Sequence, residues 1–221
     1  MAKRFDPELI PPAPTLDFEK IQWQQGFKIV AGLDEAGRGP LAGPLCAAAV
    51  ILPFDVTDLE EKLFGVRDSK QMTSFERETL APVIKEFAVD FAIAWMEVEE
   101  IDSMGMGQAG RIVFYRAVNG LRQTPKHLLI DYFRVSELEI AQTCLVKGDQ
   151  RSLSIACASV LAKQARDQRM IELSTVYEGY HFEQNKGYST PGHIKAIEEL
   201  GLCVIHRHSF CDHLLQEKLF E

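Results

Sequence analysis

Two adjacent carboxylates stand just before a glycine-rich segment early in the chain. Asp34 and Glu35 are followed by Gly37, Arg38 and Gly39. Neighbouring side chains of an extended strand point to opposite faces, so both carboxylates can serve one site only where the chain is already turning. A carboxylate suits a hard cation, glycine N–H groups suit an oxygen-rich ligand, and arginine suits a phosphate. The alternative to such a ligand site is a tight turn with a surface salt bridge. A nucleotide P-loop is excluded, because no Lys-Ser/Thr pair follows the second glycine.

Two further acids follow apolar segments and extend this candidate site. Asp131 lies at the end of the apolar run HLLIDY, and Asp149 precedes the longest helical stretch. Taken singly, the first could form a turn or cap a helix, and the second could cap the helix that follows. Taken together, four carboxylates would repel one another without a counter-charge. Two divalent ions commonly supply it in phosphodiester cleavage, so the set predicts metal-dependent phosphoryl chemistry.

The composition predicts a folded protein that does not bind nucleic acid through its overall charge. The 221 residues are 46% hydrophobic, enough for a buried core, and the net charge is −8. The first residues lack the apolar segment of a secretory signal, and no run of about 18 apolar residues could span a membrane. The five cysteines lack CxxC spacing, which is typical of reduced, mostly structural thiols. We expect a cytoplasmic protein without membrane contact.

Strands and helices alternate along the chain, which predicts an α/β fold with a mixed sheet covered by helices. The proline-rich residues 1–14 are expected to form a flexible arm before a folded domain of residues 15–221. Apolar runs and alternation predict strands at 27–33, 45–52, 89–95, 127–132 and 141–146. Periodicity and capping signals predict helices at 15–25, 74–87, 108–119, 152–176, 191–200 and 212–219. Small residues crowd the first half of helix 152–176 and would let it pack closely on its neighbour.

The order of these motifs resembles the ribonuclease HII family over roughly Leu16 to Phe210. Members of that family cleave RNA in RNA–DNA hybrids and at ribonucleotides embedded in DNA. The resemblance rests on DEAGRGPLAGP at 34–44, RDSK at 67–70, LLID at 128–131, TCLVKGDQ at 143–150, SIACASVLAKQARD at 154–167, NKGYSTPGH at 185–193 and HRHSF at 206–210. It implies a ribonuclease-H-like mixed sheet flanked by helices, with a helical C-terminal extension over about 175–221.

The resemblance also implies roles for individual residues. The residues that would bind Mg2+ or Mn2+ are Asp34, Glu35, Asp131 and Asp149. Gly37, Arg38 and Gly39 would read the ribose 2′-OH from the minor-groove side. Tyr188 would stack on the sugar that follows the ribonucleotide, and Lys70 would contact phosphate.

The implied reaction is endonucleolytic hydrolysis on the 5′ side of a ribonucleotide, with two metal ions, leaving a 3′-OH and a 5′-phosphate. The implied substrates are RNA–DNA hybrids and duplex DNA that contains ribonucleotides, and the protein is expected to be a monomer. One rival is a structure-selective DNA nuclease on a related fold, which would cleave pure DNA. Another is a catalytically inactive hybrid-binding module, which four intact carboxylates disfavour because they would weaken phosphate binding.

Other charged residues near these motifs carry further expectations. The remaining candidates for phosphate contacts are Lys147, Lys163, Arg166 and Lys186. Asp68 has Arg67 and Lys70 as neighbours, and Asp167 has Arg166 and Arg169, so we expect salt bridges for both acids. Many relatives have glycine after the LLID aspartate, where this chain has Tyr132 and Phe133, so that edge of the site is expected to differ in shape.

Two patterns near the C-terminus could each bind a further partner, although the residues favour the plainer interpretation of both. The thiol and imidazole groups that zinc prefers occur together at Cys203, His206, His208, Cys211 and His213, but their spacing fits no common zinc finger. Gln216 to Phe220 (QEKLF) is similar to the Gln-x-x-Leu-Phe peptides that bind the hydrophobic pocket of bacterial sliding clamps. The alternative for Gln216 to Phe220, which the pattern favours, is that these residues form the amphipathic end of the last helix.

Overall fold

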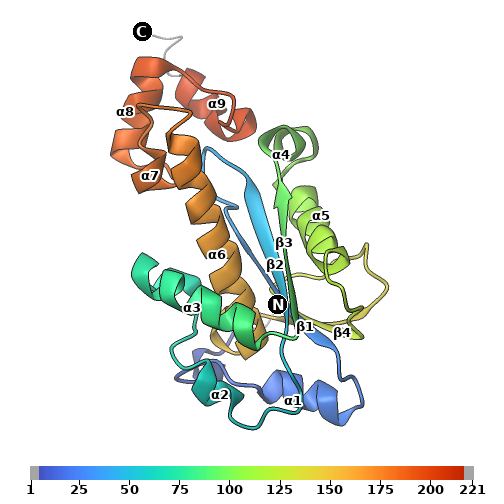
Figure 1. Cartoon of the computed structure of the whole chain (residues 1–221). Coiled ribbons are helices and arrows are strands. Elements are labelled where there is room, and N and C mark those ends of the chain that lie inside the picture. Colours follow the sequence, from blue (N-terminus) through green and yellow to red (C-terminus); the bar gives the residue numbers. More distant parts are fainter. Residues whose placement is uncertain (1–4, 217–221) are drawn as a thin grey trace.

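A five-stranded mixed sheet forms the centre of the molecule (Figure 1). The computed structural model describes residues 5–216 and the side chains of residues 5–212. The strands are β1 Val30–Ala36, β2 Leu45–Ile51, β3 Asp90–Met96, β4 His127–Asp131 and β5 Ala141–Leu145. Their order is β3-β2-β1-β4-β5, with β1 antiparallel to β2 and parallel to β4. The mixed α/β sheet predicted from the sequence is confirmed.

Helices cover the sheet and extend beyond it. The helices of the described residues are α1 Asp17–Gln24, α2 Leu59–Lys62, α3 Ser74–Phe87, α4 Val98–Met104, α5 Met106–Asn119, α6 Leu153–Ser174, α7 Phe182–Asn185, α8 Pro191–Leu200 and α9 His208–Gln216. Short 3-10 helices occur at η1 Pro7–Leu9, η2 Ser69–Gln71 and η3 Gly148–Gln150. None of the helices described is long and apolar enough to cross a membrane.

β2 is buried on both faces, as its continuous apolar sequence predicts. On one face, Cys46 and Val50 belong to a core cluster that includes residues of α3 and α6. On the other face, Ala47 and Ala49 belong to a second cluster that includes residues of α5. Figure 1 shows α3 and α6 on one side of the sheet and α5 on the other. Burial of both clusters holds the sheet between its helices.

α6 lies close against β1 because small residues line its first half, as the sequence predicts. A Cβ added at Gly32 of β1 would stand 2.3 Å from the Ser154 carbonyl carbon, so only glycine fits there. The Ser152 hydroxyl caps the helix by accepting a hydrogen bond from the Ile155 N–H. This close packing places Ser159 of α6 beside the Asp34 side chain of β1, where it lowers the pKa of that carboxyl, although burial has the larger, opposite effect.

The first strand differs from its predicted bounds. It begins at Val30 rather than Phe27, and it continues through Ala36, which lies opposite Cys46 of β2. Asp34 therefore lies within an extended, paired strand and not in a turn. Pairing with β2 extends the strand through the carboxylate pair, and a local sequence pattern does not show such pairing.

The last described helix also differs from its prediction, because a distant side chain caps it. α9 begins at His208 rather than at Asp212. The Asp102 carboxylate at α4 accepts hydrogen bonds from the backbone N–H groups of His208 at 2.8 Å and Ser209 at 3.2 Å. In contrast, the capping box of Thr73 and Glu76 at α3 forms as predicted.

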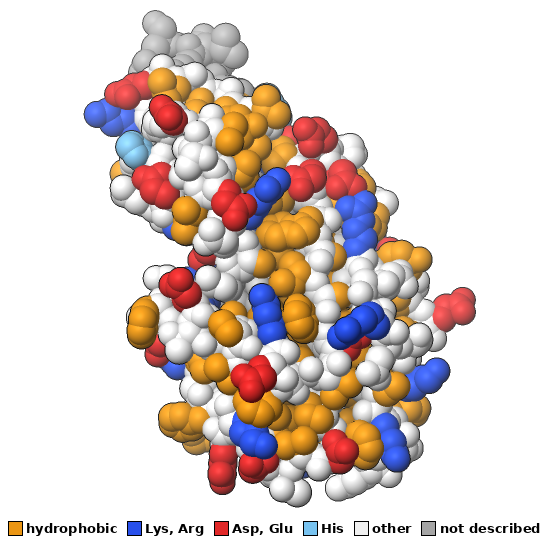
Figure 2. Space-filling view, viewed as in Figure 1, with side chains coloured by type: hydrophobic (Ala, Val, Ile, Leu, Met, Phe, Trp, Pro, Cys, Tyr) orange, Lys and Arg blue, Asp and Glu red, His pale blue; other side chains and the backbone are white. Residues whose placement is uncertain are grey.

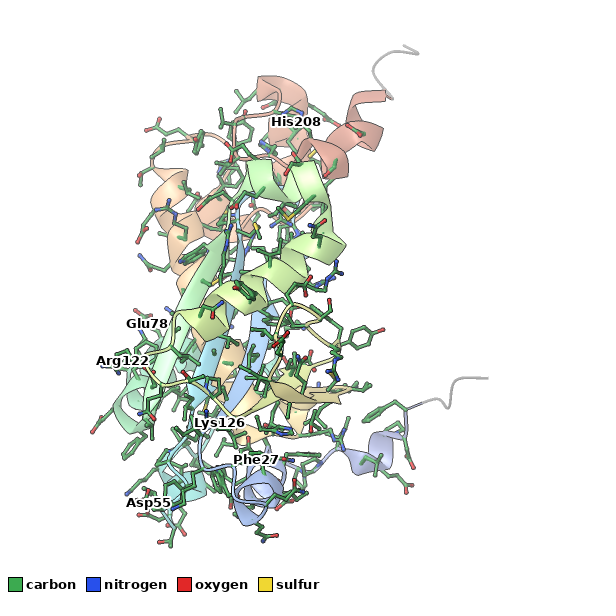
Figure 3. All side chains as sticks on the ribbon, turned by 90° about the vertical axis from the view of Figure 1, so that its right-hand side faces the viewer. Phe27, Asp55, Glu78, Arg122, Lys126 and His208 are labelled. Carbon is green, nitrogen blue, oxygen red and sulfur yellow. The ribbon has the colours of Figure 1, made fainter. Side chains whose placement is uncertain are left out.

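The C-terminal helices pack together at one end of α6 (Figure 1). Their core cluster contains Tyr180, Phe182 and Ile197, and it also contains Leu41 and Ala42 from the loop after β1. The segment that follows the carboxylate pair is therefore packed against the C-terminal region. In Figure 3, His208 at the start of α9 and Phe27 before β1 lie at opposite ends of the molecule.

The proline-rich N-terminal segment lies beside the sheet edge that carries the acids. Residues 10–14 and Arg67, Asp68 and Gln150 line a cavity of about 60 Å3. The flexible arm over residues 1–14 stays a prediction, and residues 1–4 lie outside the described part of the chain.

Candidate active site

The four predicted carboxylates gather at one edge of the sheet. Asp34 and Glu35 lie in the second half of β1, Asp131 ends β4, and Asp149 lies in η3 shortly after β5. β1 and β4 are parallel neighbours, so their carboxyl ends meet at the same edge. Asp34 Oδ1 accepts a hydrogen bond from the Glu35 N–H at 2.8 Å, and Asp131 Oδ1 accepts one from the Gly148 N–H at 2.7 Å. The structure thus brings together acids that are far apart in the sequence.

A cavity of about 550 Å3 opens beside these strand ends. Its lining residues are Glu35, Arg38, Asp68, Lys70, Asp131, Tyr132, Phe133, Val146, Lys147, Asp149 and Gln150. Asp34 is 5% exposed and is not part of the lining, but its charge interacts with those of Glu35, Asp131 and Asp149. Acidic, basic and aromatic groups therefore surround one cavity.

Burial raises the pKa of each of the four carboxyl groups, and nearby carboxylates raise it further. The pKa of Glu35 rises to about 7, and that of Asp149 also rises to about 7. The pKa of Asp34 rises well above its usual value, chiefly through desolvation and then through the charge of Glu35. A cation placed among these groups would lower all of these pKa values.

Asp68 is a fifth carboxylate of this cluster, and the salt bridge predicted for it is wrong. It is 5% exposed, and it accepts hydrogen bonds from the Lys70 N–H at 2.9 Å and from Gln150 Nε2 at 3.0 Å. After desolvation, its charge is the largest cause of the raised pKa of Asp149. η2 and the distant Gln150 hold Asp68 at the cavity, and the RDSK motif is the sequence signal that marks this position.

Lys70 lies in the same cavity and partly offsets its negative charge. Partial burial opposes the charged form of this lysine, but the charges of Asp34, Asp149 and the other nearby acids together outweigh burial and raise its pKa. In turn, Lys70 lowers the pKa of Glu35, although burial of that carboxyl is the larger effect. A lysine that stays protonated here can meet a phosphate beside the carboxylates.

The side chains of the cavity fit a hard divalent cation. The cluster offers carboxylate oxygens, and Oε2 of Glu35 is buried without a hydrogen-bond partner. Within the described part of the chain, no three His, Cys, Asp or Glu side chains lie close enough to hold a metal ion by themselves. Mg2+ usually keeps several waters and takes one or two carboxylates beside substrate phosphates, so it needs no closed protein cage.

Arg207 holds the glycine-rich segment from within the protein. Its guanidinium is fully buried and donates hydrogen bonds to the carbonyl oxygens of Gly37, Arg38, Pro40 and Gly43 at 2.7 to 3.1 Å. Burial lowers the pKa of Arg207 to about 9. Sequence reasoning did not identify this residue, although it lies in the HRHSF motif. Its role depends on a contact across some 170 residues, as in its bond to Gly37.

Arg166 supports the same segment, so its predicted phosphate contact is wrong. It is fully buried and donates to the carbonyl oxygens of Ala42, Pro44 and Lys186 at 2.9 to 3.1 Å. A Cβ added at Gly37, which has a φ of 100°, would stand 2.1 Å from Arg166 Nε. Only glycine therefore fits at this position, both for its backbone conformation and for its space.

The Arg38 side chain lines the cavity, while its backbone carbonyl oxygen is bound by Arg207. One guanidinium nitrogen lies 3.7 Å from Glu35 Oε1, and its central carbon lies 5.4 Å from the centre of the Phe133 ring. Around Gly39, a Cβ would meet nothing within 4 Å. The segment is therefore packed on its arginine-held side and open beside Gly39, where a ligand can approach the backbone.

Tyr188 presents a half-exposed ring from the loop between α7 and α8. It is 41% exposed, and Lys163 Nζ lies 5.4 Å from the ring centre. Its carbonyl oxygen lies 2.9 Å from His193 Nδ1. The carbonyl oxygen of the preceding Gly187 accepts a hydrogen bond from the Leu41 N–H at 2.9 Å. These bonds join the Tyr188 loop to the end of the glycine segment.

The remaining charged candidates have different surroundings. Lys147 lines the cavity, whereas Lys186 donates to a neighbouring backbone carbonyl. Asp167 forms salt bridges, but its partners are Arg77 at 3.0 Å and Lys163 at 2.7 Å, and not the adjacent arginines that were predicted. Helical geometry explains the pair of Lys163 and Asp167, because residues four apart on a helix face each other.

Of the predicted C-terminal cluster, Cys203 and His206 bond to each other and His206 also contacts His193, whereas Cys211 and His208 bond elsewhere. His206 Nδ1 lies 2.9 Å from the Cys203 N–H nitrogen, and its Nε2 lies 3.0 Å from His193 Nε2. Burial lowers the pKa of both histidines, that of His206 to about 4. No zinc-like group of three occurs among the residues described, and the side chain of His213 lies outside them. His193 was not part of the predicted cluster.

The surface shown in Figure 2 has no continuous basic area. Lys and Arg side chains are interspersed there with Asp, Glu and hydrophobic side chains. This distribution agrees with the net charge of −8. Positive charge near the carboxylates is instead local, and it comes from Arg38, Lys70 and Lys147 in the cavity lining.

The sheet order and the acidic cavity at its strand ends define a ribonuclease-H-like protein, and comparison with solved structures agrees. Ribonuclease H2 from Pyrococcus horikoshii matches with a TM-score of 0.76 at 26% identity, covering 87% of this chain and 100% of that chain. The PCNA:RNase HII complex from Archaeoglobus fulgidus matches with a TM-score of 0.71 at 25% identity, covering 84% and 96%. A Mn2+ complex of Bst-RNase HIII shares the fold, with a TM-score of 0.66 at 20% identity, covering 90% and 73%.

Sequence comparison narrows this class to one family. The family model described as Ribonuclease HII matches residues 31–213. A protein named Ribonuclease HII from Anaeromyxobacter is 48% identical over 88% of this chain and 60% of its own length. One from Caldicellulosiruptor saccharolyticus is 40% identical over 90% of this chain and 95% of its own length. The chain thus spans about three fifths of the first relative and nearly all of the second. It belongs to the ribonuclease HII family.

Proposed function

We propose that this protein is a metal-dependent endoribonuclease of the ribonuclease H type. It hydrolyses the RNA strand of RNA–DNA hybrids and cuts duplex DNA on the 5′ side of an embedded ribonucleotide, leaving a 3′-OH and a 5′-phosphate. The observation that carries this proposal is the meeting of buried carboxylates and the arginine-held glycine segment at one cavity. Membership of the ribonuclease HII family supports it. We propose that the protein acts as a monomer in the cytoplasm.

The carboxylate cluster supplies the cation-binding part of the mechanism. The residues that would hold two ions, Mg2+ or Mn2+, are Asp34, Glu35, Asp131 and Asp149. When bound, the ions activate water and stabilise the leaving oxygen. Asp68 positions this cluster, because it bonds to the η2 backbone and to Gln150, the neighbour of Asp149. Lys70 stays protonated among the carboxylates and contacts a phosphate of the substrate.

The glycine segment supplies selectivity for ribose. Arg207 donates hydrogen bonds to the carbonyl oxygens of this segment. The backbone N–H groups of the segment are therefore the groups left for a ligand. Gly37, Arg38 and Gly39 use them to read the 2′-OH, the group that separates RNA from DNA. Tyr188 stacks on the next sugar, since its ring is half exposed and its loop is joined to this segment.

The test is cleavage of a DNA duplex that carries one internal ribonucleotide, in Mg2+ and separately in Mn2+. Product ends are mapped beside an all-DNA duplex and an Asp34→Asn variant. We expect a cut on the 5′ side of the ribonucleotide that is lost in the variant. Cleavage of the all-DNA duplex would favour a structure-selective DNA nuclease, and binding without cleavage in either ion would favour an inactive hybrid-binding module.

We also propose that Gln216 to Phe220 binds a sliding clamp. The Archaeoglobus fulgidus relative was solved as a complex with PCNA, which supports this proposal. α9 leads into the peptide, although residues 217–221 lie outside the described part of the chain. Deleting Leu219 to Glu221 is expected to abolish pull-down by a bacterial clamp and to leave hydrolysis unchanged. Equal pull-down by the full and shortened chains would contradict the proposal.

A further inference from the structure

Tyr132 combines a strained backbone with an exposed ring at the edge of the cavity. Its φ of 70° lies in the left-handed region, which an aromatic residue rarely adopts. Its N–H donates to the Leu145 carbonyl oxygen at 2.9 Å, which ties this residue to β5 directly after Asp131 has ended β4. Tyr132 lines the cavity and yet remains 71% exposed.

Packing within the protein does not use the Tyr132 ring. The next residue, Phe133, has its ring centre 5.3 Å from that of Phe114 and 5.4 Å from the Arg38 guanidinium. Phe133 thus packs against the core cluster and Arg38, whereas Tyr132 is directed to solvent. A strained residue at a site persists only because its surroundings impose it, and such strain concentrates where ligands bind.

We propose that Tyr132 is a substrate-binding residue whose ring stacks on a nucleotide of the bound nucleic acid. This inference rests on the proposed function, and it adds a second aromatic contact to that of Tyr188. The two rings belong to different parts of the molecule. Tyr188 lies between α7 and α8, which are at the upper left of Figure 1, and Tyr132 directly follows β4, which is at the lower right.

The surroundings of Tyr132 favour a nucleotide over other flat ligands. Lys147 also lines the cavity and can meet the phosphate of a stacked nucleotide, while Asp131 adjoins Tyr132 in the sequence. A phenol ring stacks on any base, so this contact adds affinity and fixes the path of the strand without reading its sequence. A nucleic acid that contacts both rings would be held by two separate segments, the loop between α7 and α8 and the segment after β4.

Three variants separate stacking from a structural role. Tyr132→Gly removes the ring and relaxes the positive φ, whereas Tyr132→Phe keeps the ring. Tyr115→Ala is the matched control, because Tyr115 of α5 is 43% exposed and is not part of the cavity lining. KM and kcat are measured on the duplex with one ribonucleotide, and Tm is measured by thermal unfolding. In EDTA, 2-aminopurine placed at successive positions beside the ribonucleotide reports stacking by fluorescence quenching.

We expect Tyr132→Gly to raise KM about tenfold while Tm stays equal or rises, since glycine relieves the strain. Quenching at one 2-aminopurine position should be lost in Tyr132→Gly and kept in Tyr132→Phe and Tyr115→Ala. An unchanged KM and unchanged quenching in Tyr132→Gly would overturn the inference, and so would a rise in KM that accompanies a fall in Tm. Failure of the unaltered protein to cut any ribonucleotide-containing duplex would instead count against the proposed function.

Discussion

The carboxylate cavity and the arginine-held glycine segment adjoin each other, and burial opposes the charged form of the side chains in both, but only the arginines have hydrogen-bond partners that compensate for it. In the cavity, burial and mutual repulsion raise the pKa values of Asp34, Glu35 and Asp149, so negative charge destabilises the folded chain there. In the glycine segment, the buried guanidinium groups of Arg166 and Arg207 take up backbone carbonyls and hold the loop. The cavity therefore gains stability when a positive ligand binds. In the glycine segment, the carbonyl groups already have hydrogen-bond partners within the chain.

The strongest way to separate the two regions is Asp34→Asn. Cleavage is expected to fall at least on the order of a thousandfold, because one of the proposed metal-binding oxygens is lost. The free energy of unfolding should stay equal or rise, since the variant removes a buried charge whose pKa is raised. Cleavage rates and urea denaturation check both effects. A clear loss of stability would contradict the view that this charge is unfavourable in the folded protein.

In contrast to Asp34→Asn, removal of the Arg207 guanidinium should lower the free energy of unfolding. Arg207→Ala leaves several buried carbonyl groups without a donor and is expected to cost roughly 3–5 kcal/mol of unfolding free energy. Arg111→Ala is the control, because Arg111 pairs with Glu137 at the surface and should contribute less than about 1 kcal/mol. Urea denaturation of both variants gives the comparison. Equal stability of the two would show that the glycine segment does not depend on Arg207.

The pH dependence of stability should differ in sign between the cavity and the buried histidine pair of the C-terminal region. The folded pKa of Glu35 is about 7, above its ordinary value, so its contribution is present at acid pH and is lost as pH rises from about 4 through 7. The folded pKa of His206 is about 4, below its ordinary 6.5, so its contribution is present above 6.5 and is lost as pH falls from 6.5 to 4.

Each of these two groups should change the unfolding free energy by roughly 2–4 kcal/mol across its range of pH. Denaturation of Glu35→Gln and His206→Gln at a series of pH values tests this. The first variant is expected to lose less stability than the parent between pH 5 and 7, and the second is expected to lose less below 6.5. Parallel curves for both variants and the parent would rule out these assignments.

Addition of Mg2+ gives the smallest of the expected effects. At about 100 times its dissociation constant, an ion that binds only the folded protein adds about 2.7 kcal/mol, and the rise in Tm should be reduced in Asp34→Asn. Arg207→Lys is the control variant for this measurement, because it keeps a positive charge and leaves the carboxylates intact. Equal rises in Tm for the parent and Asp34→Asn would show that the ion binds elsewhere.

Local patterns predicted most of the elements but only part of the site. The capping box of Thr73 and Glu76 formed, and Asp131 lies at a strand end, because such features depend on a few neighbouring residues. Asp68 was misassigned because Gln150, which lies 82 positions away, helps to hold it at the cavity. Arg207 was missed for the same reason, since its carbonyl partners belong to the opposite end of the chain. Buried polar groups paired over such distances leave no periodic signal.

α6 joins the two halves of the site through residues at fixed positions along its axis. Ser159 lies beside the Asp34 side chain, and Arg166, seven residues later, donates to the Ala42 and Pro44 carbonyls. Seven residues make two helical turns, so both contacts lie on one face about 10 Å apart. Inserting or deleting one residue between them would rotate one contact by about 100° relative to the other. During evolution this stretch can therefore change its residues, but its length has to stay constant for the site to persist.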